Sequence, residues 1–152
     1  MTGILEFVSR SDNPNLCEEQ NALVKIILDQ VVGKRLTGYI VHEFANYAVS
    51  YAIPVRFWEI FDCIVSNLVV FLCDPHGNHV VQRCIDSKKC MDDHHGQIPI
   101  LTLAESLIKQ EADLGEVKYY AAVKLKVLTE LRQLYSKPRL TSEIKRMISN
   151  LV

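Results

Sequence analysis

Three polar side chains with flat ends stand close together in residues 74–86, which read DPHGNHVVQRCID. The Asp-Pro pair predicts a turn. After it, apolar residues recur at helical spacing, so Asn78 and Gln82, four apart, lie on one side of a helix with His79 beside them. Two amides and an imidazole off the core face suit a planar polar ligand. The alternative is a solvated helix face carrying the same residue types.

A second segment repeats this pattern. Residues 43–53 read EFANYAVSYAI, with a small residue, an asparagine, an aromatic ring, two small apolar residues and a polar residue in the same order. The matched positions are Asn46 with Asn78, Tyr47 with His79, and Ser50 with Gln82. The period of 32 residues between the two asparagines is in the range of helical repeat proteins.

The two segments resemble the inner helices of Pumilio-family (PUF) repeats, the second with a departure at Ser50. The resemblance covers residues 35–110 once the flanking helices are included. It implies an all-α fold, a right-handed α-solenoid of stacked three-helix units with degenerate capping units at the ends. The expected units are a partial N-terminal unit 1–34, two repeats 35–67 and 68–110, and a degenerate C-terminal cap 111–152.

The resemblance also implies a function. PUF repeats read single-stranded RNA at about one base per repeat with side chains of the inner helix. Asn78 and Gln82 would then bond one base edge, with uracil as the base associated with this pair, while His79 stacks on a neighbouring base. Asn46, Ser50 and Tyr47 would form the adjacent site, where the preferred base stays open. Phosphate contacts are expected from Arg83, Lys88 and Lys89.

We therefore expect an RNA-binding protein that acts after transcription, in control of mRNA translation or decay or in ribosome assembly, without catalytic activity and without a cofactor. Uracil-containing mRNA is the expected partner, together with a possible protein partner. The expected location is the cytoplasm, with the nucleolus as the alternative. A second hypothesis is a helical-repeat protein that binds other proteins, or serves as an assembly subunit, after losing base readout. The acidic N-terminal half and Ser50 favour it, and the intact set of Asn78, His79 and Gln82 opposes it.

Composition sets limits on these expectations. A chain of 152 residues with 49% hydrophobic content predicts one folded domain. No apolar run approaches the roughly 20 residues that span a bilayer, and the first residues do not resemble a secretory signal. An intracellular protein is expected. The net charge of −1 is poor support for a nucleic-acid partner, although 8 basic residues face 2 acidic ones from Val117 to the end.

The five cysteines are expected to be reduced and to serve as small hydrophobic residues. Two alternatives use them chemically. One is a zinc site, although the spacing matches no familiar motif. The other is a thiol nucleophile beside an imidazole, although no orienting third residue accompanies either pair. The zinc candidates are Cys90, His94, His95 and Cys84, and the thiol–imidazole pairs are Cys73 with His76 and Cys90 with His94.

Hydrophobic periodicity predicts the remaining helices. The expected ranges are 1–10 as a short helix or strand and the remnant of an inner helix, 23–31 ending near Gly33, 35–43, 44–53, an outer helix from Pro54 through Leu68, 77–87, 100–108, 116–134 and 141–151. Trp58 lies on the apolar stripe of the outer helix, so core placement is expected over base stacking. A third inner motif is expected near Tyr119, Tyr120 and Lys124, in either of two registers.

Overall fold

The computed structural model describes residues 18–93, 98–134 and 141–152, and every regular element within these ranges is helical. The all-α prediction is confirmed. The elements are α2 (Glu18–Val31), α3 (Leu36–Ile40), α4 (Ala45–Ser66), α5 (Leu68–Cys73), α6 (Gly77–Asp86), the 3-10 helix η1 (Lys88–Met91), α7 (Pro99–Lys109), α8 (Glu111–Leu114), α9 (Tyr120–Gln133) and α10 (Thr141–Leu151).

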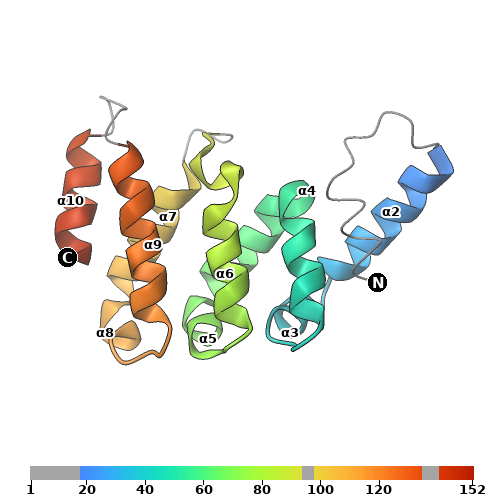
Figure 1. The fold of residues 1–152 in the computed structure, drawn as a ribbon, viewed down its shortest axis with the longest axis horizontal. Helices are drawn as coiled ribbons and strands as arrows, with labels where there is room; N and C mark the ends of the chain where they lie inside the picture. Colours follow the sequence, from blue (N-terminus) through green and yellow to red (C-terminus); the bar gives the residue numbers. More distant parts are fainter. Residues whose placement is uncertain (1–17, 94–97, 135–140) are drawn as a thin grey trace.

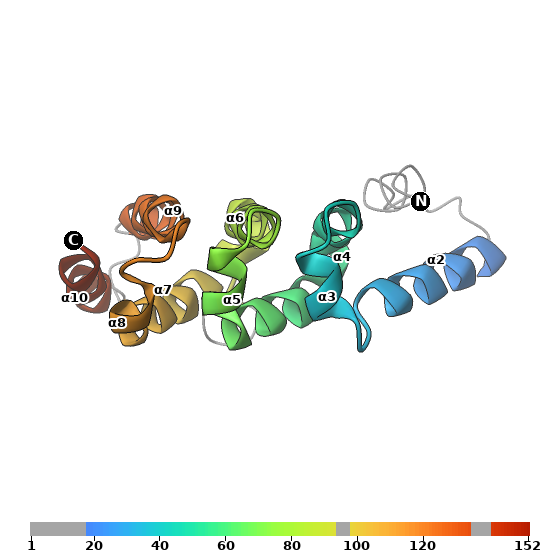
Figure 2. The ribbon, with the colours of Figure 1, turned by 90° about the horizontal axis from the view of Figure 1, so that it is seen from below.

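The helices form two layers along the longest axis of the molecule. The first part of α4 (residues 45–55), α6 and α9 lie side by side, with the short helices α3, α5 and α8 at their N-terminal ends (Figure 1). We call this row the inner layer. Seen from below, α2, the second part of α4 (residues 57–66) and α7 form the outer layer (Figure 2). The helix α10 packs against α7 and α9 at the C-terminal end.

A bend in α4 carries the chain from the inner to the outer layer. Pro54 has no N–H for the helical hydrogen-bond ladder, and Arg56 has the non-helical angles φ −130° and ψ 37°. Its guanidinium pairs with Asp29 of α2 at 2.6 Å and with Glu59 at 3.3 Å. The predicted change of helix is thus present, but the bend lies at Arg56, two residues later than expected.

Two other boundaries differ from the sequence prediction. The helix expected from Glu116 begins only at Tyr120, because the preceding residues form two successive turns in which Val117 bonds the Leu114 carbonyl and Tyr120 bonds the Val117 carbonyl. Leu68 opens α5 instead of extending the outer helix, because Asn67 leaves the helical region at φ −132°. The end of α2 before Gly33 is as predicted.

The hydrophobic core lies between the two layers. Its largest fully buried side chains include Phe57 and Ile60 from the outer part of α4, Phe71 from α5 and Ile85 from α6. Trp58 is half-buried against this core, edge-on to the Phe57 ring at 5.2 Å. Its predicted core placement is therefore confirmed. In the part of the chain that the structure describes, no helix combines the length and apolarity needed to cross a membrane.

Several predictions concern residues outside the described ranges. They are the remnant of an inner helix at 1–10, His94 and His95 as metal ligands, and His94 as the imidazole partner of Cys90.

Candidate nucleic-acid interface

The start of α6 is held by the side chain of Asp74. Its Oδ1 accepts hydrogen bonds from the backbone N–H groups of His76 at 2.8 Å and Gly77 at 2.7 Å, which are otherwise unpaired at a helix start. At Gly77 an added Cβ would come within 3.0 Å of the Phe71 carbonyl oxygen, so the missing side chain lets α6 begin close against the end of α5. The predicted turn at Asp74 and Pro75 thus fixes the register of α6.

Asn78 is buried, with 1% of its surface exposed. Its Nδ2 donates to the carbonyl oxygens of Asp74 at 2.9 Å and Pro75 at 2.8 Å, so both amide hydrogens are used. In this conformation Asn78 connects the turn to the helix and offers no hydrogen to a ligand. The expected direct contact between Asn78 and a base edge therefore does not fit this geometry.

Gln82 lies between Asn78 and the surface. Its Nε2 donates to Asn78 Oδ1 at 2.8 Å, and the side chain is half-buried. One Nε2 hydrogen and Oε1 then remain, side by side, for a ligand. Because one of the two Nε2 hydrogens is already bonded, the amide plane is oriented before any ligand arrives.

An exposed row of planar groups crosses from α4 to α6. The Tyr47 ring is 46% exposed, and the Cζ of Arg83 lies 5.7 Å from its centroid. His79 is also exposed, one turn before Arg83 on α6. Guanidinium, phenol and imidazole groups all stack on nucleobases. We call Tyr47, His79 and Arg83 the stacking row.

The copy of the motif on α4 has the same buried asparagine, but it has a serine where α6 has the glutamine amide. Asn46 is 4% exposed and donates to the carbonyl oxygens of His42 at 2.8 Å and Glu43 at 2.9 Å, as Asn78 does one unit later. Ser50 is buried and donates to the Asn46 carbonyl oxygen at 2.9 Å. Of the three predicted site residues on α4, Tyr47 is exposed, Asn46 is buried, and Ser50 is buried but lines a groove beside α6.

The same turn is built in the two units from different residues. In the first unit His42 Nδ1 accepts from the N–H groups of Phe44 and Ala45, at 3.1 and 3.2 Å. These positions match those of Asp74, His76 and Gly77 in the second unit. The His42 imidazole and the Asp74 carboxylate thus both accept hydrogen bonds from the backbone N–H groups at the start of an inner helix. The sequence analysis missed His42 because the two residue types differ.

The structure settles the register of the third inner helix. The N–H of Val123 bonds the Tyr119 carbonyl as that of Val80 bonds the His76 carbonyl, so Tyr120 takes the position of Gly77. The positions of Asn78, His79 and Gln82 are then filled by Ala121, Ala122 and Leu125. The third inner helix carries no base-reading set. Just before this helix, Lys118 Nζ lies 5.3 Å from the centroid of the Tyr119 ring, and on the helix Lys124 Nζ lies 5.6 Å from the centroid of the Tyr120 ring.

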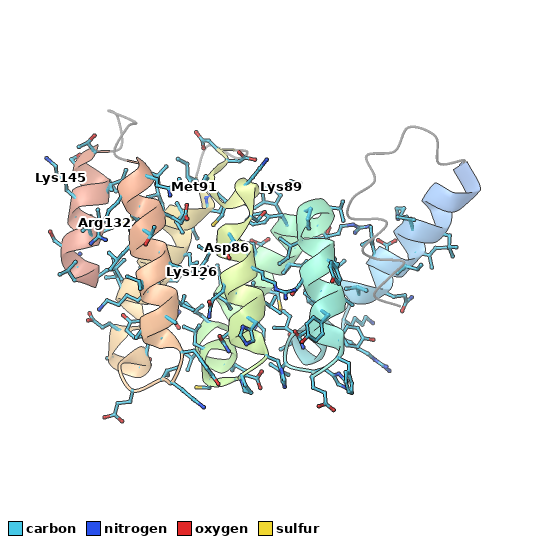
Figure 3. The ribbon with its side chains drawn as sticks, viewed as in Figure 1. Asp86, Lys89, Met91, Lys126, Arg132 and Lys145 are labelled. Atoms are coloured by element: carbon cyan, nitrogen blue, oxygen red, sulfur yellow. The ribbon has the colours of Figure 1, made fainter. Side chains whose placement is uncertain are left out.

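A groove of about 440 Å³ runs beside the C-terminal half of α6. Arg83, Lys88 and Lys89 line it together with Asp86, whose carboxylate is paired with Lys126 of α9 at 2.8 Å. Figure 3 shows Asp86 and Lys126 on the facing helices α6 and α9, and Lys89 beyond the end of α6. With Asp86 neutralised, this groove has a surplus of positive charge and could accept a phosphate.

Cys90 belongs to both the zinc alternative and one of the two predicted thiol–imidazole pairs. Cys90 is fully buried, and its burial, followed by the nearby carboxylates of Glu130 and Asp86, raises the pKa of its thiol to about 12. Burial also raises the pKa of the Cys84 thiol well above its usual value, with Cys90 adding to the effect. Both thiols therefore stay protonated near neutral pH, which makes them poor nucleophiles. Cys73, the thiol of the other predicted pair, is exposed. Among the described residues, no group of three or more His, Cys, Asp and Glu side chains could hold a metal ion.

Comparison with known proteins finds no matching family model, no matching curated protein and no matching solved structure.

The hydrogen bonds of Asn78 predict a stability effect. In Asn78→Asp, a carboxylate oxygen replaces the donating amide and faces two carbonyl oxygens, so we expect the free energy of unfolding to fall by about 1–3 kcal/mol. The matched variant Asn150→Asp changes an exposed residue of α10, where the expected effect stays within about 0.5 kcal/mol. Urea denaturation at pH 7 measures both. Equal stability of the two variants would contradict the role given to Asn78.

The cysteine environments predict selective labelling. At pH 8 the folded chain should react with a disulfide reagent at the exposed Cys73, while Cys84 and Cys90 stay unmodified because both are buried and protonated. Peptide mapping by mass spectrometry measures the labelling, with urea-unfolded chain as the control in which all sites react. Modification of Cys90 in the folded chain as fast as that of Cys73 would contradict its burial.

Proposed function

We propose that this chain is a single-stranded RNA-binding protein that resembles the Pumilio family and acts in post-transcriptional control of mRNA. In this proposal the fold is a short right-handed α-solenoid with repeats 35–67 and 68–110, a partial unit 1–34 and a cap 111–152. Three successions of a short helix, an inner helix and a following helix support it, starting at α3, α5 and α8. The repeated hydrogen-bond pattern of Asn46 and Asn78 supports it further.

The observation that carries the proposal is the oriented Gln82 amide beside the stacking row. A nucleobase has a flat face and an edge with hydrogen-bond groups, so its recognition needs a planar platform and an edge-on polar group. Tyr47 and Arg83 provide a platform that joins two units, at 5.7 Å from each other. Gln82 provides one donor and one acceptor, held in place by Asn78 at 2.8 Å.

Base preference rests on fewer groups than the motif implies. One amide pairs with N3–H and a carbonyl of uracil, but it also matches donor–acceptor pairs on the other bases. The preference for uracil in our proposal comes from the family resemblance. Any such preference depends on Gln82, because Asn78 has no free hydrogen and Ser50 already bonds the backbone.

The size of the interface limits the affinity. Stacking of a base on an aromatic side chain contributes about 1–3 kcal/mol. Two rings and one amide therefore reach, at best, about micromolar affinity, near −8 kcal/mol. We expect phosphate contacts by Arg83, Lys88 and Lys89 to raise it, with a corresponding dependence on salt. Cytoplasmic mRNA is the proposed target, and nucleolar RNA is the alternative.

One observation favours a second function, that of a protein-binding or assembly subunit without base readout. Asn46 and Asn78 each satisfy backbone carbonyls within their own turn, so both asparagines have a structural role that needs no RNA. The exposed Tyr47, His79 and Arg83 have no such explanation, and they favour the first function.

Fluorescence polarisation with short labelled oligouridylate and oligoadenylate tests the proposal. We expect tighter binding of oligouridylate, and loss of this preference in Gln82→Ala. Tyr47→Ala should weaken binding of both RNAs by about 5- to 100-fold, since it removes a stacking ring. Arg83→Lys keeps the charge but removes the planar group, and it should also weaken binding.

One matched variant serves as the control. Arg132→Lys makes the same exchange as Arg83→Lys but on α9, outside the stacking row, and should bind as the unaltered chain does. If Gln82→Ala, Tyr47→Ala and Arg83→Lys all bind both RNAs as the unaltered chain does, base readout is excluded and the assembly function is favoured.

A further inference from the structure

The groove of about 440 Å³ beside the C-terminal half of α6 adjoins the stacking row. Arg83 belongs to both, since its guanidinium lies over the Tyr47 ring and also lines the groove. Lys88 and Lys89, which follow the end of α6, line the groove as well. An RNA strand with a base on the stacking row can therefore place the neighbouring phosphate among these three cations. The inference below rests on the proposed RNA binding.

The charges that line the groove determine whether it can hold a phosphate. None of the ion pairs in the part of the chain that the structure describes joins Arg83, Lys88 or Lys89 to a carboxylate. Two features oppose an anion, namely the Asp86 carboxylate, which also lines the groove, and the negative end of the α6 dipole. Ser50 does not help, because it already donates its hydroxyl hydrogen to a backbone carbonyl oxygen at 2.9 Å. Phosphate binding thus depends on how far the charge of Asp86 is neutralised.

A residue outside the groove neutralises Asp86. Lys126 belongs to the next inner helix, α9, and its Nζ lies 2.8 and 2.9 Å from the two Asp86 carboxylate oxygens. The two residues come from the facing helices α6 and α9 (Figure 3). The Asp86 side chain is 55% exposed and that of Lys126 is 34% exposed. A ligand at the surface beside them therefore experiences either charge, with screening by water and salt.

We propose that the groove binds a phosphate of single-stranded RNA and that Lys126 raises its affinity indirectly, by neutralising Asp86. Arg83, Lys88 and Lys89 contact the phosphate, whereas Lys126 does not. The contribution is the same for every base, because phosphate contacts carry no sequence information directly. Lys126 therefore affects the affinity for RNA but not the preference for one base over another.

Fluorescence polarisation with labelled oligouridylate and oligoadenylate at low salt tests this role of Lys126. Lys126→Gln leaves the Asp86 charge unpaired beside the phosphate, so binding of both RNAs should weaken by about 3- to 10-fold, with their ratio unchanged. In Asp86→Asn/Lys126→Gln the carboxylate charge is removed as well, and binding should return to within about twofold of that of the unaltered chain.

Two matched variants control for net charge. Lys124→Gln removes a cation from the same helix, but Lys124 lies over the Tyr120 ring, so RNA binding should change by less than about twofold. Glu116→Gln removes an exposed carboxylate just before α9 and should not restore binding to Lys126→Gln. Circular dichroism checks the folding of each variant, which should persist because partly exposed ion pairs contribute little to stability.

Two results would overturn the proposal. One is binding of both RNAs by Lys126→Gln as tight as by the unaltered chain. The other is a double variant that binds as weakly as Lys126→Gln, because Lys126 would then contact the RNA itself.

Failure of the proposed RNA binding would give a different result. If the unaltered chain binds neither RNA, inorganic pyrophosphate serves as the probe, and the amide chemical shifts of residues 87–89 measure its binding. Shifts that decrease in Lys126→Gln and return in the double variant would support the phosphate site and its control by Lys126, while excluding RNA as the ligand. Absence of such shifts would overturn both.

Discussion

The hydrogen bonds of the buried asparagine at the start of each motif-bearing inner helix are the constraint on which the rest of the site depends. In the second unit the Asn78 amide joins the turn at Asp74 and Pro75 to α6 and leaves its oxygen for Gln82. An unpaired buried amide costs more than a paired one contributes, so the turn and the helix must keep this geometry together. The direction in which α6 presents His79, Gln82 and Arg83 follows from it.

These hydrogen bonds divide the side chains of the motif into a buried group that bonds the backbone and an exposed group that can meet a ligand. Asn46, Ser50 and Asn78 are turned inward and bond the backbone, whereas Tyr47, His79 and Arg83 face outward. Gln82 is at the boundary and connects the two groups. A ligand therefore meets three stacking groups and one amide. That small set explains why we propose weak, salt-dependent binding to single-stranded RNA, in contrast to the tight binding of a long repeat array.

Much of the fold could be predicted from the sequence, because apolar periodicity and turn residues mark most helices. The all-α class, the turn at Asp74 and Pro75 and the end of α2 all follow from local patterns. The bend at Arg56 and the late start of α9 could not be predicted, because each depends on a choice between helix and turn that local propensity leaves nearly balanced. The register of α9 became clear only from its hydrogen bonds.

The sequence predicted which residues form the candidate site, but it did not predict what each side chain does there. The motif identified the positions, yet an asparagine that binds a base and one that bonds the backbone have the same sequence signature. The sequence analysis also missed the apolar groove of about 920 Å³ between α2 and the first part of α4, for a related reason. Periodicity shows that Ile26 and Ile27 belong to an apolar face, but only packing shows that Ile26 stays exposed among the described residues.

Photocrosslinking with RNA that contains 4-thiouridine tests the central claim most directly, because it reports where bases lie on the folded chain. Peptide mapping should find adducts at Tyr47 and His79 in the unaltered chain, and the His79 adduct should decrease in Asn78→Asp under conditions in which this variant remains folded. Adducts confined to α7 or α10, or adduct levels on the stacking row that do not change in Asn78→Asp, would contradict the account.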